Sequence, residues 1–446
     1  MNPRPADRPP QPWRWIPSLY FGQGIPYVVV MTVAVVMYKN LGVGNTEIAL
    51  WTSWLYLPWV IKPLWSPLVE LLGRKRRWIV GLQFVIGALL ATVALALPAP
   101  HWFQLTLALF WLMAFASATH DIAADGFYLL ALGERTQAAF VGVRSTFYRL
   151  AMIAGQGGFV VLAGVLHERA GGASADWVDA WATVMGLVAA GFVALGLWHA
   201  WALPRPAGDE AAPAAEELGR EAGGGRHIGS AFVQVFAAFF RQRDIVRVLA
   251  FLLLYRFAEA QLLKLVAPFL LDPLVAGGLA LRTQDVGIAY GTVGVAALTA
   301  GGLLGGWWVS RVGLARALWP LVLCMHAPNL LYVALAAAQP QGLALVSAAI
   351  AVEQFGYGLG FTAYMVFMLQ VASGPDEANP HKTAHYAICT GFMALGMMLP
   401  GMAAGWLQQQ LGYTAFFVWC CVATLPSFAA AAWIGPGIRP RPTLPA

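Results

Sequence analysis

Apolar runs long enough to cross a lipid bilayer recur twelve times along this chain. A helix needs about 20 residues to span the hydrocarbon core, and a backbone in lipid satisfies its own hydrogen bonds most readily as a helix. The predicted spans are residues 16–38, 46–72, 78–98, 102–132, 138–166, 178–202, 244–271, 285–309, 317–338, 343–371, 384–407 and 413–435. Only 11% of the residues are charged, against about a quarter in soluble proteins. We therefore predict an all-α membrane protein.

A polar break between the sixth and seventh runs divides the spans into two sets of six. The break holds the charged stretch LPRPAGDEAAPAAEELGREAGGGRH, which is typical of a flexible linker, and then IGSAFVQVFAAFFRQR, which predicts an amphipathic helix on the membrane surface. Two bundles joined in this way are typical of a secondary transporter. The predicted parts are a disordered cytoplasmic tail (1–15), a six-helix bundle (16–202), a cytoplasmic linker (203–243), a second six-helix bundle (244–435) and a cytoplasmic tail (436–446).

Basic residues outside the spans are distributed unevenly. If the N-terminus is cytoplasmic, the outer loops hold only Lys39, Arg169 and Arg282, whereas the tails, the linker and the inner loops hold all the others. Cytoplasmic loops of membrane proteins are enriched in Lys and Arg, so both termini are predicted to be cytoplasmic. This asymmetry accounts for the net charge of +6, which therefore does not indicate a nucleic-acid partner.

Two related loops link the halves of the chain. SPLVELLGRKRR (66–77) follows the second span and GWWVSRVGLAR (306–316) follows the eighth. Both resemble the major facilitator signature G-x-x-x-D-R-x-G-R, although Leu71 replaces an arginine in the first and Ser310 replaces the acid in the second. The resemblance implies a major facilitator fold of twelve transmembrane helices, with structural roles for Glu70, Arg74 and Arg311.

Charged residues lie deep within several spans, where each costs about 2.5–3.5 kcal/mol if it faces lipid. They must therefore pair or line a watery cavity. Asp121 and Asp125, at i and i+4, share one helix face at a depth similar to that of Arg144. Structural pairing and a role in gating or coupling are both open. Asp125 is nearer the surface and is predicted to be structural, whereas Asp121, beside His120, is the better candidate for a proton site.

The second half carries its own deep charges. Arg256 and Glu259, at i and i+3, can neutralise each other. Glu353 lies near the middle of the tenth span, where three glycines soften the helix. Glu353 either binds substrate or a proton, or pairs with Arg256 or Lys264. The predicted substrate-binding or gating residues are Tyr20, Gln23, Lys62, Arg144, Arg149, Gln156, Arg256, Glu259 and Lys264, and the predicted proton-coupling residues are Asp121, His120 and Glu353.

Four segments resemble one transporter family. They are PWVIKPLWSPLVE (58–70), SATHDIAADGF (117–127), STFYRLAMIAGQGG (145–158) and LLLYRFAEAQLL (252–263). Together they look like the AmpG-type muropeptide permeases, to which the acetyl-coenzyme A transporters are related. The resemblance implies proton-driven import of anhydro-muropeptides across the bacterial inner membrane, with Asp121 as the coupling carboxylate. It further implies that Lys62, Asp121, Asp125, Arg149, Arg256 and Glu259 occupy the charged positions of the family. His120 and Glu259 stand where the family commonly has Gln and Asp.

The predicted partners are an anionic small molecule, protons and the lipid bilayer, and the protein is predicted to be a monomer without cofactor or metal. Deep cations suit an anionic substrate, because arginines bind carboxylates well. The alternatives are an exporter or importer of another anion, such as a siderophore or a coenzyme A ester, and a membrane-embedded enzyme or sensor. The sequence has no H-E-x-x-H, G-x-S-x-G or phosphate-binding loop, which disfavours an enzyme.

Overall fold

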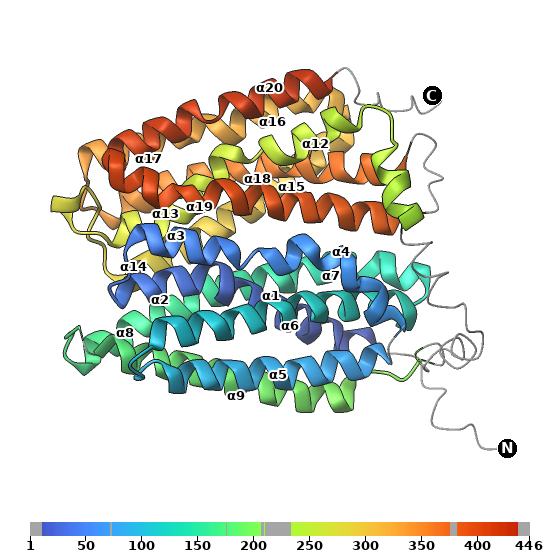
Figure 1. Ribbon diagram of the computed structural model, residues 1–446, viewed down its shortest axis with the longest axis horizontal. Helices are drawn as coiled ribbons and strands as arrows, with labels where there is room; N and C mark the ends of the chain where they lie inside the picture. The colour runs from blue at the N-terminus through green and yellow to red at the C-terminus, as the bar shows by residue number, and fades with distance from the viewer. Residues whose placement is uncertain are drawn as a thin grey trace.

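The computed structural model describes residues 11–71, 74–174, 176–206, 209, 233–374 and 381–435, which form helices and turns but no strand (Figure 1). Most of the two predicted tails and of the predicted linker lies outside these residues. Within the linker, residues 233–240 are helical, where the sequence predicts an amphipathic helix. Phe239 of this helix is fully buried, whereas Val233 is 64% exposed, so one face of the helix packs against the protein and another points outward.

Six crossings make up the N-terminal bundle, drawn in blue to green in Figure 1. The first consists of α1 (Ile16–Val28), η3 (Val29–Val33) and α2 (Ala34–Asn40), and the second of α3 (Asn45–Trp54) and α4 (Leu57–Leu71). The others are α5 (Lys75–Ala96), α6 (Trp102–Ala131), the run α7 (Glu134–Ile153), η4 (Ala154–Phe159) and α8 (Val160–Ala170), and α9 (Asp176–Ala202). Here η3 and η4 are short π-helical stretches within longer helices.

Six further crossings make up the C-terminal bundle. They are α12 (Ile245–Leu254) with α13 (Phe257–Leu271); α14 (Thr283–Val286) with the π-helical η7 (Gly287–Gly294) and α15 (Val295–Val312); α16 (Leu314–His326) with η8 (Ala327–Asn329) and α17 (Leu330–Ala338); α18 (Leu343–Ser373); and α19 (Lys382–Val422) with α20 (Leu425–Ile434). Inside α19 the backbone turns back at Gly412, whose φ of 75° suits a residue without a Cβ. This turn separates the eleventh crossing from the twelfth, so the predicted twelve-helix fold is confirmed.

Among the described residues, turns break three of the crossings. They lie at residues 55–56, 255–256 and 423–424, and they separate α3 from α4, α12 from α13, and α19 from α20. Nine helical segments of the described residues are long and apolar enough to span a membrane. Discontinuous helices are tolerated in a bilayer where their free backbone groups line a cavity. The first two breaks place Tyr56 and Arg256 on the central cavity described below.

The two bundles lie side by side with their helices roughly parallel (Figure 1). We call the end at which α1 begins and α20 finishes the proximal end, and the opposite end the distal end. Buried apolar residues of α1, α5, α6 and α9 form one core, which includes Phe110 and Trp181. Separate apolar cores hold the second bundle together, around Tyr364 and around Phe417. Each bundle thus has apolar cores largely of its own, with Ala267 and Ala49 joining the cores of the opposite bundle.

Candidate functional site

Polar side chains join the two bundles at the distal end. Lys39, at the end of α2, forms a 2.5 Å salt bridge with Asp272, just after α13. Asn45 donates to Asp272 at 3.0 Å and to Tyr413 at 2.9 Å, and Tyr413 donates to Asp272 at 2.6 Å. Asp272 is 9% exposed, so its charge is neutralised across the interface rather than by water. We call these four residues the distal latch.

A second group of distal contacts strengthens the junction. Asn40 donates to Thr283 at 2.9 Å, and Glu168, in the last turn of α8, accepts from Gln284 and lies 3.6 Å from Arg282. These contacts again pair a residue of the first bundle with a residue of the second. The distal ends of the two bundles are therefore held together in this structure.

Below the distal latch, the two bundles touch through backbone. The π-helical stretches η4 and η7 cross where Gly157 and Gly291 face each other. A Cβ on Gly291 would lie 2.1 Å from the carbonyl carbon and oxygen of Gln156, and one on Gly157 would lie 2.5 Å from Thr292 Oγ1. Glycine is therefore required here for close approach of the two bundles.

A central cavity of about 150 Å³ lies between the bundles. Its lining comes from α1, η3, α2, α7 and η4 of the first bundle, from α13, η7, α15, α18 and α19 of the second, and from the turns at Tyr56 and Arg256. Polar and charged groups lining it are Tyr27, Thr32, Tyr56, Gln156, Arg256, Lys264, Tyr290, Gln354 and Tyr357. Of the predicted binding residues, the structure thus brings Gln156 of the first bundle and Arg256 and Lys264 of the second to one cavity.

The two cations of the cavity have no carboxylate partner in a salt bridge among the described residues. Arg256 donates to the hydroxyl of Tyr357 and lies 4.9 Å from the ring centre of Phe361. Lys264 Nζ donates to Thr52 Oγ1 at 3.0 Å and lies 5.1 Å from the ring centre of Tyr56. Both residues are less than 10% exposed. Buried cations with neutral partners favour an anion, so the cavity is suited to a negatively charged group.

Two ion pairs on α6 hold the proximal half of the first bundle. Lys62 of α4 lies 3.6 Å from Asp121, which also accepts from Trp59 Nε1 at 3.3 Å. Gln23 of α1, which is 7% exposed, is a near neighbour of this carboxylate. One turn along, Arg144 of α7 contacts Asp125 at 2.6 Å. Sequence spacing places Asp121 and Asp125 on one face, and the structure gives each carboxylate a cation of its own from a different helix.

Arg144 contacts two aromatic rings that are nearly perpendicular to each other. Its guanidinium lies 4.3 Å from the ring centre of Tyr20 and 4.4 Å from that of Tyr128. Tyr20 also donates to Asp125 at 3.4 Å. Tyr20 and Arg144, which the sequence offered for substrate binding or gating, therefore lie in one cluster with Asp125 in the structure.

That cluster gives a prediction for stability. Asp125→Asn removes the carboxylate charge and leaves Arg144 beside its two rings without its anion. The Asp125 side chain is 47% exposed, so water compensates in part, and we expect the free energy of unfolding to fall by about 1 kcal/mol. Thermal unfolding in detergent measures this loss, with Arg135→Gln, at an exposed position of α7, as the control. If Asp125→Asn unfolds at the same temperature as the wild type, the Asp125–Arg144 pair does not stabilise the protein.

His120 faces a different set of neighbours from Asp121. Its Nε2 lies 3.1 Å from Gln83 Nε2, Gln83 Oε1 lies 2.9 Å from His199 Nδ1, and His199 Nε2 lies 2.9 Å from Ser18 Oγ. Because Gln83 Nε2 is a donor, His120 Nε2 accepts here, and His199 Nδ1 correspondingly donates to the amide oxygen. This chain of polar groups crosses α1, α5, α6 and α9 and was not foreseen from the sequence.

The other predicted residues lie in several places. Arg149 of α7 reaches the second bundle, where its Nη1 lies 3.5 Å from Thr299 Oγ1. Arg74 is the exposed residue before α5, and Arg311 lies 5.5 Å from the ring centre of Trp307. Glu70 lies outside the residues whose side chains are described. Glu259 and Glu353 are fully buried in the second bundle.

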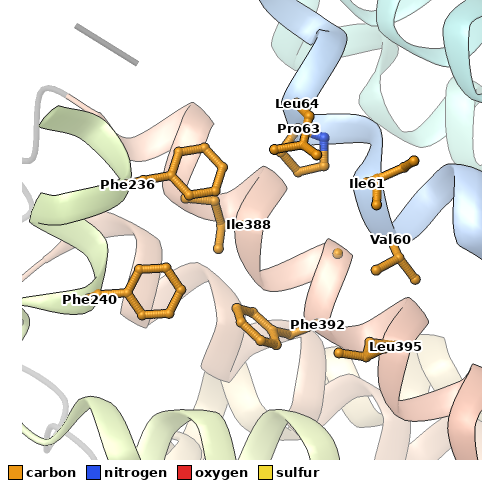
Figure 2. Close-up of a pocket in the computed structure, with 10 residues that line it drawn as sticks. Val60, Ile61, Pro63, Leu64, Phe236, Phe240, Ile388, Phe392 and Leu395 are labelled. Carbon is orange, nitrogen blue, oxygen red and sulfur yellow. The ribbon is translucent and has the colours of Figure 1, made fainter. Parts of the chain in front are cut away.

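A second cavity of about 150 Å³ is apolar (Figure 2). Phe236 and Phe240 of the helix 233–240 lie on one side of it, near Ile388 and Phe392 of α19, and Leu64 of α4 lies on the other. The lining contains no charged or polar side chain. This cavity therefore offers nothing to a charged group, and the central cavity remains the candidate site for an anion.

Comparison with known proteins places the fold in a family. A model described as the Major Facilitator Superfamily matches residues 18–379. The chain belongs to the major facilitator superfamily. Among solved structures, a nucleoside transporter NupG mutant superposes with a TM-score of 0.66 at 16% identity, covering 94% of this chain and 98% of that one. A bacterial homologue of the human lysosomal transporter Spinster, in an inward-facing and unoccupied conformation, also gives 0.66, at 14% identity over 97% and 100% of the two chains.

Curated relatives refine the relationship. The anhydromuropeptide permease of Escherichia coli is 24% identical over 422 residues, which is 92% of this chain and 76% of the permease. A putative transporter AmpG 4 of Rickettsia conorii is 22% identical over 91% of this chain and 92% of its own length. The resemblance to muropeptide permeases that the sequence motifs indicate is confirmed, and the protein is a multi-pass membrane protein of a permease family.

Proposed function

We propose that this protein is a proton-coupled importer of an anionic amphiphilic solute, of which anhydro-muropeptides are the preferred class. The observation that carries the proposal is the central cavity between the bundles, in which Arg256 and Lys264 are buried without a carboxylate partner in a salt bridge. A solute carboxylate supplies the missing anion. The named relatives support the muropeptide class.

Alternating access follows from the two-bundle architecture. We take the distal end as periplasmic, both termini as cytoplasmic and the bilayer as the bacterial inner membrane. In the present state the distal latch closes the periplasmic side. Opening that side requires the Lys39–Asp272 pair and the crossing of Gly157 with Gly291 to separate, while each bundle keeps its own core. The solute then enters from the periplasm and leaves on the other side.

Asp121 is the proposed coupling carboxylate, with His120 and Glu353 as further predicted proton sites. Protonation of Asp121 removes its charge and weakens its pair with Lys62, which joins α4 to α6. Because α4 also packs against α19 of the second bundle, a change at this pair reaches the interface. An acid-outside gradient contributes about 1.4 kcal/mol per pH unit for each proton carried.

The test is uptake of labelled anhydro-muropeptide into proteoliposomes with and without an acid-outside gradient. We expect wild-type uptake to depend on the gradient and Asp121→Asn to lose that dependence. Asp125→Asn, one turn along α6, is the matched control and should remain gradient-dependent. If Asp121→Asn keeps the wild-type dependence, the coupling role is wrong. If folded wild-type protein takes up no muropeptide, that cargo is wrong, and siderophores or coenzyme A esters are the next anions to assay.

A further inference from the structure

Behind the central cavity, two carboxyl groups are neighbours inside the second bundle. Glu259, in the first turn of α13, and Glu353, in the first half of α18, are both fully buried. The two groups interact electrostatically with each other. Glu353 Oε2 accepts from Tyr332 at 3.1 Å and from Gln354 at 3.0 Å, whereas Glu353 Oε1 accepts from no donor among the described residues.

Glu259 has no hydrogen-bond donor of its own. Neither of its carboxyl oxygens accepts from a donor among the described residues. Arg256, three residues earlier, directs its Nη2 to Tyr357 and forms no salt bridge with Glu259, and Lys264 donates to Thr52. Two ionised carboxylates cannot share a buried site without strong repulsion. Because neither carboxyl group has a cation in a salt bridge, the two buried neighbours require a proton on one of them.

We propose that Glu259 and Glu353 form a carboxyl pair that holds one proton between them, a second proton-binding site distinct from Asp121. The remaining single negative charge is stabilised by the Tyr332 hydroxyl, by the Gln354 amide and by the N-terminal end of α13. The titratable groups that face the pair from neighbouring elements are Arg256 at the start of α13, Tyr290 of η7, Tyr332 of α17, Tyr357 of α18 and Cys420 of α19.

The pair is connected to the solute cavity. Gln354 lines that cavity and donates to Glu353, and Tyr357 lines it and accepts from Arg256. An anion bound at Arg256 therefore changes the field at the pair, which lies one layer of side chains behind. A role for this proton in transport rests on the importer function proposed above. The binding of the proton by the two glutamates does not depend on that function.

Infrared difference spectroscopy of the purified wild-type protein against Glu259→Gln and Glu353→Gln tests the shared proton without any solute. Glutamine resembles a protonated glutamate in shape and keeps a hydrogen-bond donor, so each single variant replaces the proton by an amide and retains one carboxylate. We expect the C=O stretching band of a protonated carboxyl at neutral pH in the wild type, lost in both single variants. Asp121→Asn is the control that should retain it.

Two outcomes would overturn the pair. A band that persists in both variants belongs to another residue, and a band lost in only one variant belongs to a lone protonated carboxyl. Size-exclusion chromatography confirms that each variant is folded before its spectrum is interpreted. Because the spectra need no transport, failure of muropeptide uptake leaves this test intact, and loss of the shared band leaves the importer proposal to be judged by uptake alone.

Discussion

Replacement of Gly291 by leucine is expected to stop uptake while leaving the protein folded. A Cβ at this position would lie 2.1 Å from the Gln156 carbonyl and 2.3 Å from the backbone nitrogen of Gly157. All three atoms belong to the backbone of the opposite bundle, so no rotation of a side chain relieves the overlap. The bundles must separate at the distal end, and a transporter that cannot close this end cannot complete its cycle.

A distance reporter distinguishes this outcome from misfolding. Asn40 and Thr283 join the bundles by a 2.9 Å hydrogen bond, so Asn40→Cys with Thr283→Cys, in a background without the native cysteines, should form a disulfide when the distal end is closed. We expect cross-linking and uptake to fall at least tenfold together in Gly291→Leu. If the open and closed states have equal free energies in the wild type, destabilising the closed state by about 2.7 kcal/mol leaves it only about 1% populated. The clash of a leucine side chain with backbone atoms costs more than this.

The matched control lies beside the facing glycine. Gly158 follows Gly157 in η4, yet nothing lies within 4 Å of a Cβ added to it. Gly158→Leu therefore adds the same side chain to the same π-helical stretch without entering the interface, and it should cross-link and transport like the wild type. Undiminished cross-linking in Gly291→Leu, or an equal loss in Gly158→Leu, would show that the glycine crossing does not control closure.

Hydropathy alone sufficed to predict the helical architecture. Apolar length determines which segments can span a bilayer, and each of the twelve predicted runs corresponds to a crossing. The breaks at residues 55–56 and 255–256 were not foreseen, because neither interrupts the apolar pattern. They depend on a cavity that only the assembled bundles create.

Pairing of the deep charges was less predictable. The i, i+3 spacing of Arg256 and Glu259 left mutual neutralisation open, but Arg256 donates to Tyr357 and forms no salt bridge with Glu259, whose carboxyl oxygens accept from no described donor. Spacing gives the face of a helix that a residue occupies, whereas the opposing helix decides its partner. The sequence does predict that His120 and Asp121 have different neighbours. Consecutive residues lie about 100° apart around a helix, so their side chains point toward different helices.

Removal of the Lys264 charge is expected to raise the KM of uptake for an anionic solute about tenfold to a hundredfold. Lys264 is 5% exposed and donates to Thr52, so its charge is available to an anion with little competition from water. A hydrogen bond to a charged group contributes about 1.5–3 kcal/mol, and each 1.4 kcal/mol is about a factor of ten in affinity. Uptake kinetics of Lys264→Gln in proteoliposomes measure the effect, and Thr52→Val, which keeps the charge, serves as the control.

Changing the charge of the solute decides whether Lys264 acts on the anion itself. Comparing an anhydro-muropeptide with its carboxamide, in wild type and in Lys264→Gln, forms a double-mutant cycle between side chain and solute. If Lys264 binds the solute carboxylate, the variant should lose affinity for the acid but little for the amide, since the amide has no charge to pair. Equal losses for both solutes would mean that Lys264 maintains the shape of the cavity, and the anionic character of the cargo would then rest on Arg256 alone.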